Sequence, residues 1–176
     1  MNYLAKAIFL DRDGVINRKA PEGSYVARVS DVEVLPSSLE AIAKLCANGW
    51  LVFVVTNQRG IARGIVSEEA VEEIHRWLSD QVTNSGGRIM QVYYCPHDYS
   101  DLCNCRKPKP GMLLRAAREY SLDLARSWMV GDSICDVQAG RAAGCRTVYI
   151  GEGECDRADV RASSLQALVD QLLQLR

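Results

Sequence analysis

Four side chains that commonly bind transition metals lie within eleven positions of the chain, namely Cys95, His97, Cys103 and Cys105. Zinc takes thiolate and imidazole ligands at the corners of a tetrahedron, and three cysteines with one histidine would fill every corner without leaving one for a catalytic water. A disulfide is the alternative, but Cys103 and Cys105 are too close to pair comfortably, and a histidine has no part in a disulfide framework. We therefore predict a structural Zn²⁺ in the loop over residues 95–105.

Two cations, Arg106 and Lys107, follow this loop directly. Bound zinc would fix the direction of both side chains, because residues beside a metal's ligands belong to the same rigid loop. The formal net charge of the chain is −1, so no general basic field attracts nucleic acid or an anionic membrane. The pair therefore predicts a local site for a small anion.

Acidic and hydroxyl side chains follow other short apolar runs. Asp11 and Asp13 come directly after the first run, Thr56 after the second and Asp132 after a later one. Ligands of open α/β sheets bind at the carboxyl ends of the strands, so we expect these side chains to meet there. Asp11 can attack phosphorus to give an aspartyl-phosphate, while Asp13 protonates the departing alkoxide and later activates water. Thr56 and Lys107 can bind the transferring phosphoryl group.

Carboxylates gathered in this way need a cation. Asp11 and Asp132 offer hard oxygen ligands that suit Mg²⁺, which also bridges to phosphate. Each motif alone is more often a turn, since Asp-x-Asp-Gly and Gly-Asp-Ser sequences favour local Asx hydrogen bonds. Their order along the chain, each after a successive strand, favours a catalytic magnesium site.

The segments that must position these residues alternate between short apolar runs and helical periodicity, which predicts a doubly wound α/β fold with a mainly parallel five-stranded sheet flanked by helices. The predicted strands are Ala7–Leu10, Leu51–Val55, Ile89–Tyr94, Trp128–Val130 and Thr147–Ile150. The predicted helices cover Ser38–Asn48, a segment capped by Ser67 with Val71, Ile74, Leu78 and Val82 on one face, Gly111–Tyr120, Ile134–Ala143, and a last segment capped by Ser163. We expect Gly151–Arg161 to be irregular and exposed.

The composition bounds the architecture. The chain has 176 residues, of which 48% are hydrophobic, and this is enough for one domain over residues 1–176 with its own core. No large insertion separates the first strands, so we expect no large cap domain, and the loop over residues 19–25 would shape the pocket together with the zinc loop. Seven cysteines without a secretory leader or a long apolar stretch predict a cytoplasmic protein without membrane contact. We expect a monomer.

The ordered motifs resemble those of the haloacid dehalogenase-like phosphatases. The matching segments are Phe9–Gly14, Val55–Asn57, Lys107–Pro108 and Gly131–Asp136. The resemblance implies that Asp11 is the nucleophile and Asp13 the proton donor. It also implies Mg²⁺ on Asp11, the Asp13 backbone and Asp132, with a supporting role for Asp136.

Longer strings, Thr56–Gly64, Cys95–His97 and Cys105–Met112, resemble the heptose-bisphosphate phosphatases within that superfamily. This resemblance implies removal of the C7 phosphate from D-glycero-D-manno-heptose 1,7-bisphosphate, a sugar for lipopolysaccharide or surface glycans, and it leaves the anomer open. We expect substrate contacts from Gly23, Ser24, Tyr25, Asn57, Gln58, Arg59, Arg106 and Ser133. Arg59 replaces a residue that is usually small in that family, so it either grips a second phosphate or is a solvated surface side chain.

Three other functions fit parts of the pattern. A histidinol-phosphate phosphatase has the same zinc loop, but acidic residues in the substrate loop would favour it, and this chain has Arg18 and Lys19 beside Glu22. A phosphoacceptor signalling domain uses an aspartate after its third strand rather than its first. A non-catalytic zinc-stabilised binding module would not need every residue of phosphoryl transfer.

Overall fold

The computed structural model describes residues 4–153, 155 and 157–174. Within these residues, six strands form one sheet in the order β3-β2-β1-β4-β5-β6, and every neighbouring pair is parallel. The strands are β1 (Ala7–Leu10), β2 (Leu51–Asn57), β3 (Ile89–Cys95), β4 (Trp128–Gly131), β5 (Arg146–Ile150) and β6 (Val160–Ala162). The helices are α1 (Ser38–Ala47), α2 (Glu68–Asn84), α3 (Gly111–Tyr120), α4 (Ile134–Ala143) and α5 (Leu165–Gln174), with short 3₁₀ helices η1 (Val29–Asp31), η2 (Tyr99–Asp101) and η3 (Leu124–Arg126).

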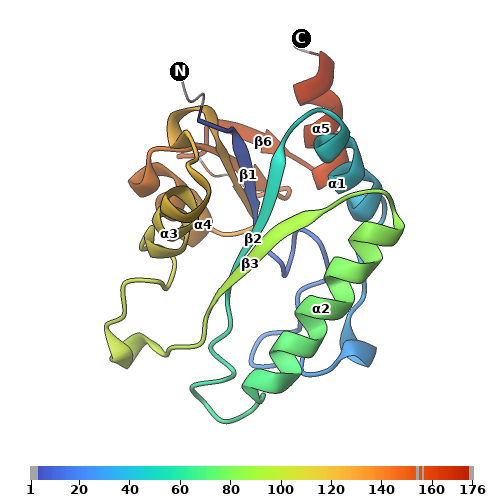
Figure 1. The fold of residues 1–176 in the computed structure, drawn as a ribbon. Helices are drawn as coiled ribbons and strands as arrows, with labels where there is room; N and C mark the ends of the chain where they lie inside the picture. The colour runs from blue at the N-terminus through green and yellow to red at the C-terminus, as the bar shows by residue number, and fades with distance from the viewer. Residues whose placement is uncertain (1–3, 154, 156, 175–176) are drawn as a thin grey trace.

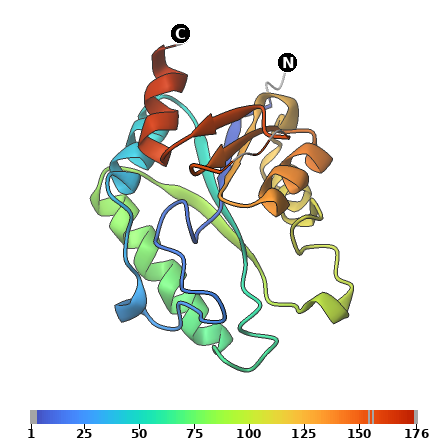
Figure 2. The ribbon, with the colours of Figure 1, turned by 180° about the vertical axis from the view of Figure 1, so that it is seen from behind.

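Helices cover both faces of the sheet, so its strands are buried on two sides. Successive strand residues point to opposite faces, and in β1 this sends Ile8 and Leu10 into the core beneath α1, α2 and α5, and Ala7 and Phe9 into the core beneath α3 and α4. Figures 1 and 2 show α1 and α5 on one side of the sheet and α3 and α4 on the other. All four β1 residues are fully buried, which explains why this strand reads as a continuous apolar run.

The helices follow the predicted caps with one correction. Ser67 Oγ accepts a hydrogen bond from the Ala70 N–H at the start of α2, and all four apolar positions predicted for this helix are buried. Gly144 ends α4 in the left-handed conformation that glycine adopts without strain. The predicted Ser163 cap is wrong, because Ser164 Oγ accepts from the Ala167 N–H and α5 begins one residue later than that prediction requires.

The parallel α/β fold is confirmed, but the prediction of five strands is wrong. The sixth strand, β6, lies at the end of the stretch that we expected to be irregular, and Val160 pairs there with Val148 of β5. Its three residues include the exposed Arg161, so the apolar signal was too short to predict a strand. Backbone pairing with β5 stabilises this strand, although the β propensity of its own three residues is too weak to predict it.

The topology brings the ends of β1 and β4 together. The chain builds β1, β2 and β3 toward one edge of the sheet and then returns to place β4 on the other side of β1. Ligands of doubly wound sheets bind where the strand order reverses, outside the carboxyl ends of the strands. Asp11 and Asp132 directly follow β1 and β4, and the Asp11 N–H donates to the Val130 carbonyl. None of the helices in the described part of the chain is long and apolar enough to cross a membrane.

Candidate active site

A cavity of about 420 Å³ opens at the carboxyl ends of the central strands. It brings together all the predicted catalytic, magnesium-binding and substrate-contacting residues, which are Asp11, Asp13, Gly23, Ser24, Tyr25, Thr56, Asn57, Gln58, Arg59, Arg106, Lys107, Asp132, Ser133 and Asp136. These residues come from the ends of β1, β2 and β4, from the loop before α1 and from the loop after the predicted zinc ligands. The sequence therefore identified the lining of one pocket from segments far apart in the chain.

Lys107 is a buried cation between two carboxylates. Its Nζ lies 3.0 Å from Asp11 Oδ1 and 2.6 Å from Asp136 Oδ1, and it donates to the Val55 carbonyl at 2.8 Å. Burial alone would lower the pKa of Lys107, but Asp11 and Asp136 raise it. The side chain is therefore a permanent positive charge beside the predicted nucleophile.

Asn57, at the end of β2, fixes the backbone that carries Lys107. Its Oδ1 accepts from the Lys107 N–H and its Nδ2 donates to the Lys107 carbonyl, both at 3.1 Å. This pair of bonds joins β2 to the segment after the cysteine cluster. Asn57 thus orients a cation as well as lining the cavity.

Asp11, Asp132 and Asp136 each offer one carboxylate oxygen within 4.8 Å of the others. Three clustered carboxylates match the oxygen ligands that Mg²⁺ prefers. Gly14 leaves room for the Asp132 carboxylate, because its φ is +91° and a Cβ at this position would overlap that carboxylate. Lys19 Nζ contacts Asp132 Oδ2 at 3.1 Å from the loop before α1, so two lysines flank the group.

Burial sets the charge of Asp11. Removal from water, together with the Asp136 and Asp13 carboxylates, raises the pKa of Asp11 to about 7, although Lys107 opposes the shift. Burial also raises the pKa of Asp132, against the attraction of Lys19. Another positive charge among these carboxylates would favour their ionised forms. The donor set therefore fits a divalent cation on chemical grounds as well as by proximity.

Asp13 does not belong to this carboxylate group and is surrounded by hydrogen-bond donors. Arg12 donates to both of its carboxylate oxygens at 3.1 and 3.0 Å, Asn17 Nδ2 donates at 2.8 Å and Gln58 Nε2 at 3.3 Å. Burial alone would raise the pKa of Asp13, but Arg12 and these hydrogen bonds lower it. The Asp13 carboxylate is thus held by four hydrogen bonds, and the magnesium contact implied by the resemblance, through its backbone, stays a prediction.

Thr56 lies near the end of β2 and is one of the residues that line the cavity. Its Oγ1 accepts from Gln58 Nε2 at 2.9 Å. Because that bond uses the oxygen as acceptor, the hydroxyl hydrogen of Thr56 remains for another acceptor. Gln58 consequently orients both Thr56 and Asp13.

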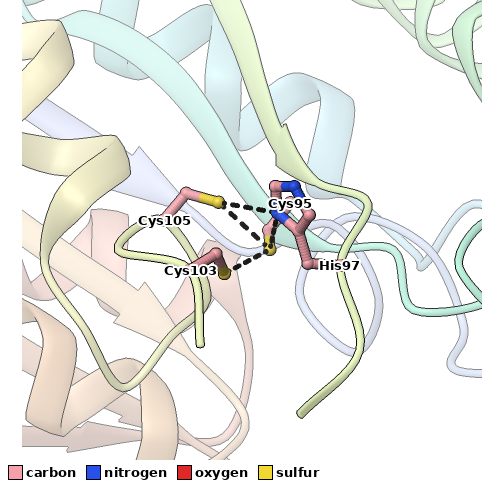
Figure 3. Close-up of side chains that lie close together, drawn as sticks. All are labelled: Cys95, His97, Cys103 and Cys105. Carbon is pink, nitrogen blue, oxygen red and sulfur yellow. Dashed lines mark hydrogen bonds between the residues drawn. The ribbon is translucent and has the colours of Figure 1, made fainter. Parts of the chain in front are cut away.

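The four predicted zinc ligands converge at the end of β3, as Figure 3 shows. Cys95 Sγ lies 3.5 Å from His97 Nδ1, 3.6 Å from Cys103 Sγ and 3.3 Å from Cys105 Sγ. Two thiolates of a tetrahedral zinc site lie about 3.8 Å apart, given Zn–S bonds of about 2.3 Å. The four atoms are therefore already close to the spacing that zinc requires, and the cysteines are not joined in a disulfide.

The segment between the predicted zinc ligands carries an aromatic ring that orders two cations. Tyr99 lies in η2, and the guanidinium carbons of Arg59 and Arg106 lie 4.5 and 4.4 Å from the centre of its ring. Arg59 Nε also donates to Asp98 at 2.6 Å. Both residues line the cavity. The Arg59 side chain is held against Tyr99 and Asp98 but keeps 34% of its surface exposed, so its grip on a second phosphate stays a prediction.

The other predicted substrate residues border the cavity with different partners. Gly23, Ser24 and Tyr25 belong to its lining, and Arg63 donates to the Tyr25 hydroxyl at 3.2 Å. The Ser133 hydroxyl donates to Asp136 at 2.7 Å in the cap of α4, so Ser133 orients a carboxylate that also binds Lys107. Their contacts with a substrate stay predictions.

Comparison with known proteins assigns the family. The family model described as HAD-hydrolase-like matches residues 104–175. A D-glycero-beta-D-manno-heptose-1,7-bisphosphate 7-phosphatase of Pseudomonas aeruginosa is 45% identical over 147 residues, which cover 84% of this chain and 82% of the relative. The chain belongs to the HAD-like phosphatase family. The resemblance seen in the strand-end motifs is thereby confirmed.

HAD-like phosphatases of known structure share the whole fold. The crystal structure of the D,D-heptose 1,7-bisphosphate phosphatase from Bordetella bronchiseptica, complexed with magnesium and phosphate, has a TM-score of 0.89 at 37% identity and covers 97% of this chain and 99% of its own. A HAD-like phosphatase from Mesorhizobium loti has a TM-score of 0.84 at 32% identity and covers 98% and 88%. The fold of this chain is thus shared with these phosphatases over nearly its whole length.

Two residues near the site, Arg12 and His75, were not predicted from the sequence. Arg12 stands between two predicted catalytic aspartates, but only the structure shows that its side chain turns back into the protein, where it is 1% exposed. The structure also buries His75, to which the sequence analysis gave no role, against Arg12. The position of Arg12 between two acids was an available signal, whereas His75 gave none because its partner lies 63 residues away.

Proposed function

We propose that this chain removes the C7 phosphate of D-glycero-D-manno-heptose 1,7-bisphosphate, in the supply of activated heptose for lipopolysaccharide or surface glycans. The observation that carries the proposal is the convergence of Asp11, Lys107 and the carboxylate group with the paired arginines Arg59 and Arg106 in one cavity. The names of the cited heptose-bisphosphate phosphatases support this substrate, and the name of the Pseudomonas aeruginosa relative favours its β anomer.

In the first step, an Asp11 carboxylate oxygen attacks the phosphorus and the bond from phosphorus to the sugar oxygen breaks. Asp13 must carry a proton at this stage, against the hydrogen bonds that favour its ionised form, and it gives this proton to the departing alkoxide, which leaves as the sugar hydroxyl. The Thr56 hydroxyl and the Lys107 ammonium bind phosphoryl oxygens, where negative charge must be stabilised. The products are an aspartyl-phosphate and the dephosphorylated sugar.

In the second step, the Asp13 carboxylate takes a proton from water as the water oxygen attacks phosphorus. The bond from phosphorus to the Asp11 oxygen then breaks, inorganic phosphate leaves and the Asp11 carboxylate is restored. The hydrogen bonds that Asp13 accepts from Arg12 favour its ionised form, which is the form that acts as base. The cycle consumes one water and returns both aspartates to their starting states.

We propose that Asp11, Asp132 and the Asp13 backbone bind Mg²⁺, with Asp136 in the same carboxylate group as a support. When bound, the ion neutralises charge on the carboxylates and the phosphoryl oxygens. We propose that Cys95, His97, Cys103 and Cys105 bind a structural Zn²⁺. Arg106 and Lys107 follow that site directly, so zinc would hold the loop from which both cations enter the cavity.

The two arginines that contact Tyr99, Arg59 and Arg106, are placed to bind the phosphate that stays on the sugar. Arg106 Nε is buried and has no hydrogen-bond partner among the described residues, while its Nη1 donates to the His97 carbonyl. An unpaired buried guanidinium N–H is costly, and phosphate accepts such donors well. We propose that Arg106 and Arg59 bind the C1 phosphate and that residues 23–25, Asn57, Gln58 and Ser133 border the sugar.

The remaining features of the proposal concern the protein as a whole. We propose that residues 1–176 form one domain, that it acts as a cytoplasmic monomer, and that it requires neither nucleic acid nor a membrane. The net charge of −1 supports the absence of a nucleic-acid partner. Sedimentation of the purified protein at micromolar concentration tests the monomer directly.

Phosphorus NMR tests the proposed reaction. The protein is incubated with Mg²⁺ and β-heptose 1,7-bisphosphate, and the C7 and C1 phosphate signals are followed separately. We expect the C7 signal to disappear as inorganic phosphate appears, with the C1 signal retained. Loss of the C1 signal first, or no loss of either signal, would contradict the proposal.

A further inference from the structure

His75 is a buried histidine that belongs to none of the proposed catalytic or metal-binding groups. It lies in α2, is 6% exposed and its Nε2 is 3.2 Å from Arg12 Nη1. The Tyr94 ring packs near it, with ring centres 5.4 Å apart. Tyr94 is held in turn by α2, because its hydroxyl lies 2.9 Å from a Glu68 carboxylate oxygen and 3.2 Å from one of Glu72 and can donate its hydrogen to either.

The direction of the hydrogen bond between His75 and Arg12 follows from chemistry. A guanidinium group has only donors and stays protonated, so Arg12 Nη1 must donate and His75 Nε2 must accept. The imidazole is therefore neutral with its proton on Nδ1. Removal of this acceptor would leave a guanidinium N–H unpaired inside the protein, which is unfavourable unless the guanidinium turns toward another acceptor.

The opposite edge of the same guanidinium holds Asp13. Nε and Nη2 of Arg12 donate to the two carboxylate oxygens, and Nη2 is also 3.4 Å from Gln58 Oε1. A planar guanidinium is rigid, so a rotation that satisfies Nη1 elsewhere would also displace the two donors from Asp13. His75 is thus connected to Asp13 through one rigid group.

We propose that His75 is a positioning residue: by accepting from Arg12 it fixes the guanidinium in the orientation that aims the Asp13 carboxyl at the leaving oxygen. This inference rests on the proposed role of Asp13 as proton donor. Small displacements of a catalytic group lower reaction rates strongly. His75, which contacts Asp13 only through Arg12, would therefore control proton donation without touching the substrate.

A comparison of two leaving groups distinguishes a positioning role of His75 from a purely structural one, because loss of structure alone would lower kcat/KM for both substrates equally. An alkoxide needs a proton as it departs, whereas p-nitrophenolate departs without one. The value of kcat/KM reports only the steps up to departure of the leaving group, so it excludes the later attack of water. Misplacement of Asp13 should therefore lower kcat/KM for a sugar phosphate and leave kcat/KM for p-nitrophenyl phosphate nearly unchanged.

The experiment compares His75→Leu, which removes the acceptor, with His75→Gln, whose amide oxygen can accept from Arg12. We expect His75→Leu to lower kcat/KM about tenfold or more for the sugar phosphate that the wild type prefers and by less than about twofold for p-nitrophenyl phosphate. His75→Gln should restore most of the lost activity. Val82→Ala, which removes buried volume from the same helix away from Arg12, should leave the ratio of the two kcat/KM values unchanged.

Two results would overturn the proposal. One is wild-type kcat/KM for the sugar phosphate in His75→Leu, and the other is an equal loss on both substrates in His75→Leu. Failure of the proposed function is distinguishable, because it would appear in the wild type as preference for a sugar phosphate other than heptose bisphosphate. The comparison of His75 variants would then be made with that preferred substrate.

Discussion

His75 should make the folded protein less stable in acid, by an amount that follows from its burial. Removal from water and the adjacent Arg12 charge lower the pKa of His75 to about 3, against a smaller opposing effect of Asp13. An unfolded histidine has a pKa of about 6.5. Above that value both states are neutral and His75 contributes nothing to the pH dependence. As the pH falls below it, only the unfolded chain binds the proton, and stability is lost.

The magnitude is set by this difference in proton binding. At pH 5 an unfolded histidine favours its protonated form about thirtyfold, whereas His75 in the folded protein stays neutral, so the free energy of unfolding falls by about 2 kcal/mol between pH 7.5 and pH 5. Other groups also titrate in this range, including the predicted metal ligands. The His75→Gln variant lacks only the histidine and therefore separates its contribution.

Urea unfolding at constant zinc and magnesium measures the effect. Free energies of unfolding are determined for the wild type and His75→Gln at several pH values from 7.5 to 5. We expect the wild type to lose about 2 kcal/mol more than the variant over this range. A difference between the two proteins that stays constant with pH, or that changes in favour of the wild type in acid, would refute the reasoning.

Three further predictions concern the proposed catalytic and metal sites. Asp11→Asn should lower the rate of phosphate release at least about a thousandfold with an unchanged far-ultraviolet circular dichroism spectrum, and release at the wild-type rate would exclude Asp11 as nucleophile. Gly14→Ala places a methyl group against Asp132 at a backbone φ of +91°, so it should raise the Mg²⁺ concentration needed for half-maximal activity, and an unchanged concentration would contradict the close approach. Removal of zinc with a chelator should lower both the melting temperature and kcat/KM, whereas full activity in protein shown by metal analysis to be zinc-free would contradict a role for the zinc loop in directing Lys107.

Local sequence patterns predicted the fold well where burial was continuous. Strand β1 and helices α3 and α4 have the predicted bounds. Strand β2 extends two residues beyond its apolar run because Thr56 and Asn57 pair with Tyr94 and Cys95 of β3. Pairing between strands decides such ends, and the sequence of one strand does not contain that information.

The acidic and hydroxyl residues Asp11, Asp13, Thr56 and Asp132 were predictable because they lie at or just beyond the ends of strands that topology brings together. The missed contacts join distant elements: Arg12 reaches back to His75 on α2, and Asn57, which was predicted to contact the substrate, also fixes the backbone of Lys107. A polar side chain that orients another side chain by a hydrogen bond has no characteristic sequence spacing from its partner. Only the packing of helices on the sheet shows which partner it meets.

Phosphate release from a substrate panel tests the central claim most directly. The panel contains both anomers of heptose 1,7-bisphosphate, histidinol phosphate and fructose 1,6-bisphosphate, each with Mg²⁺, and kcat/KM is measured for each compound. We predict the highest kcat/KM for the β anomer of heptose 1,7-bisphosphate. Preference for histidinol phosphate would contradict the proposed substrate, and absence of phosphate release from every compound would contradict the proposed phosphatase chemistry itself.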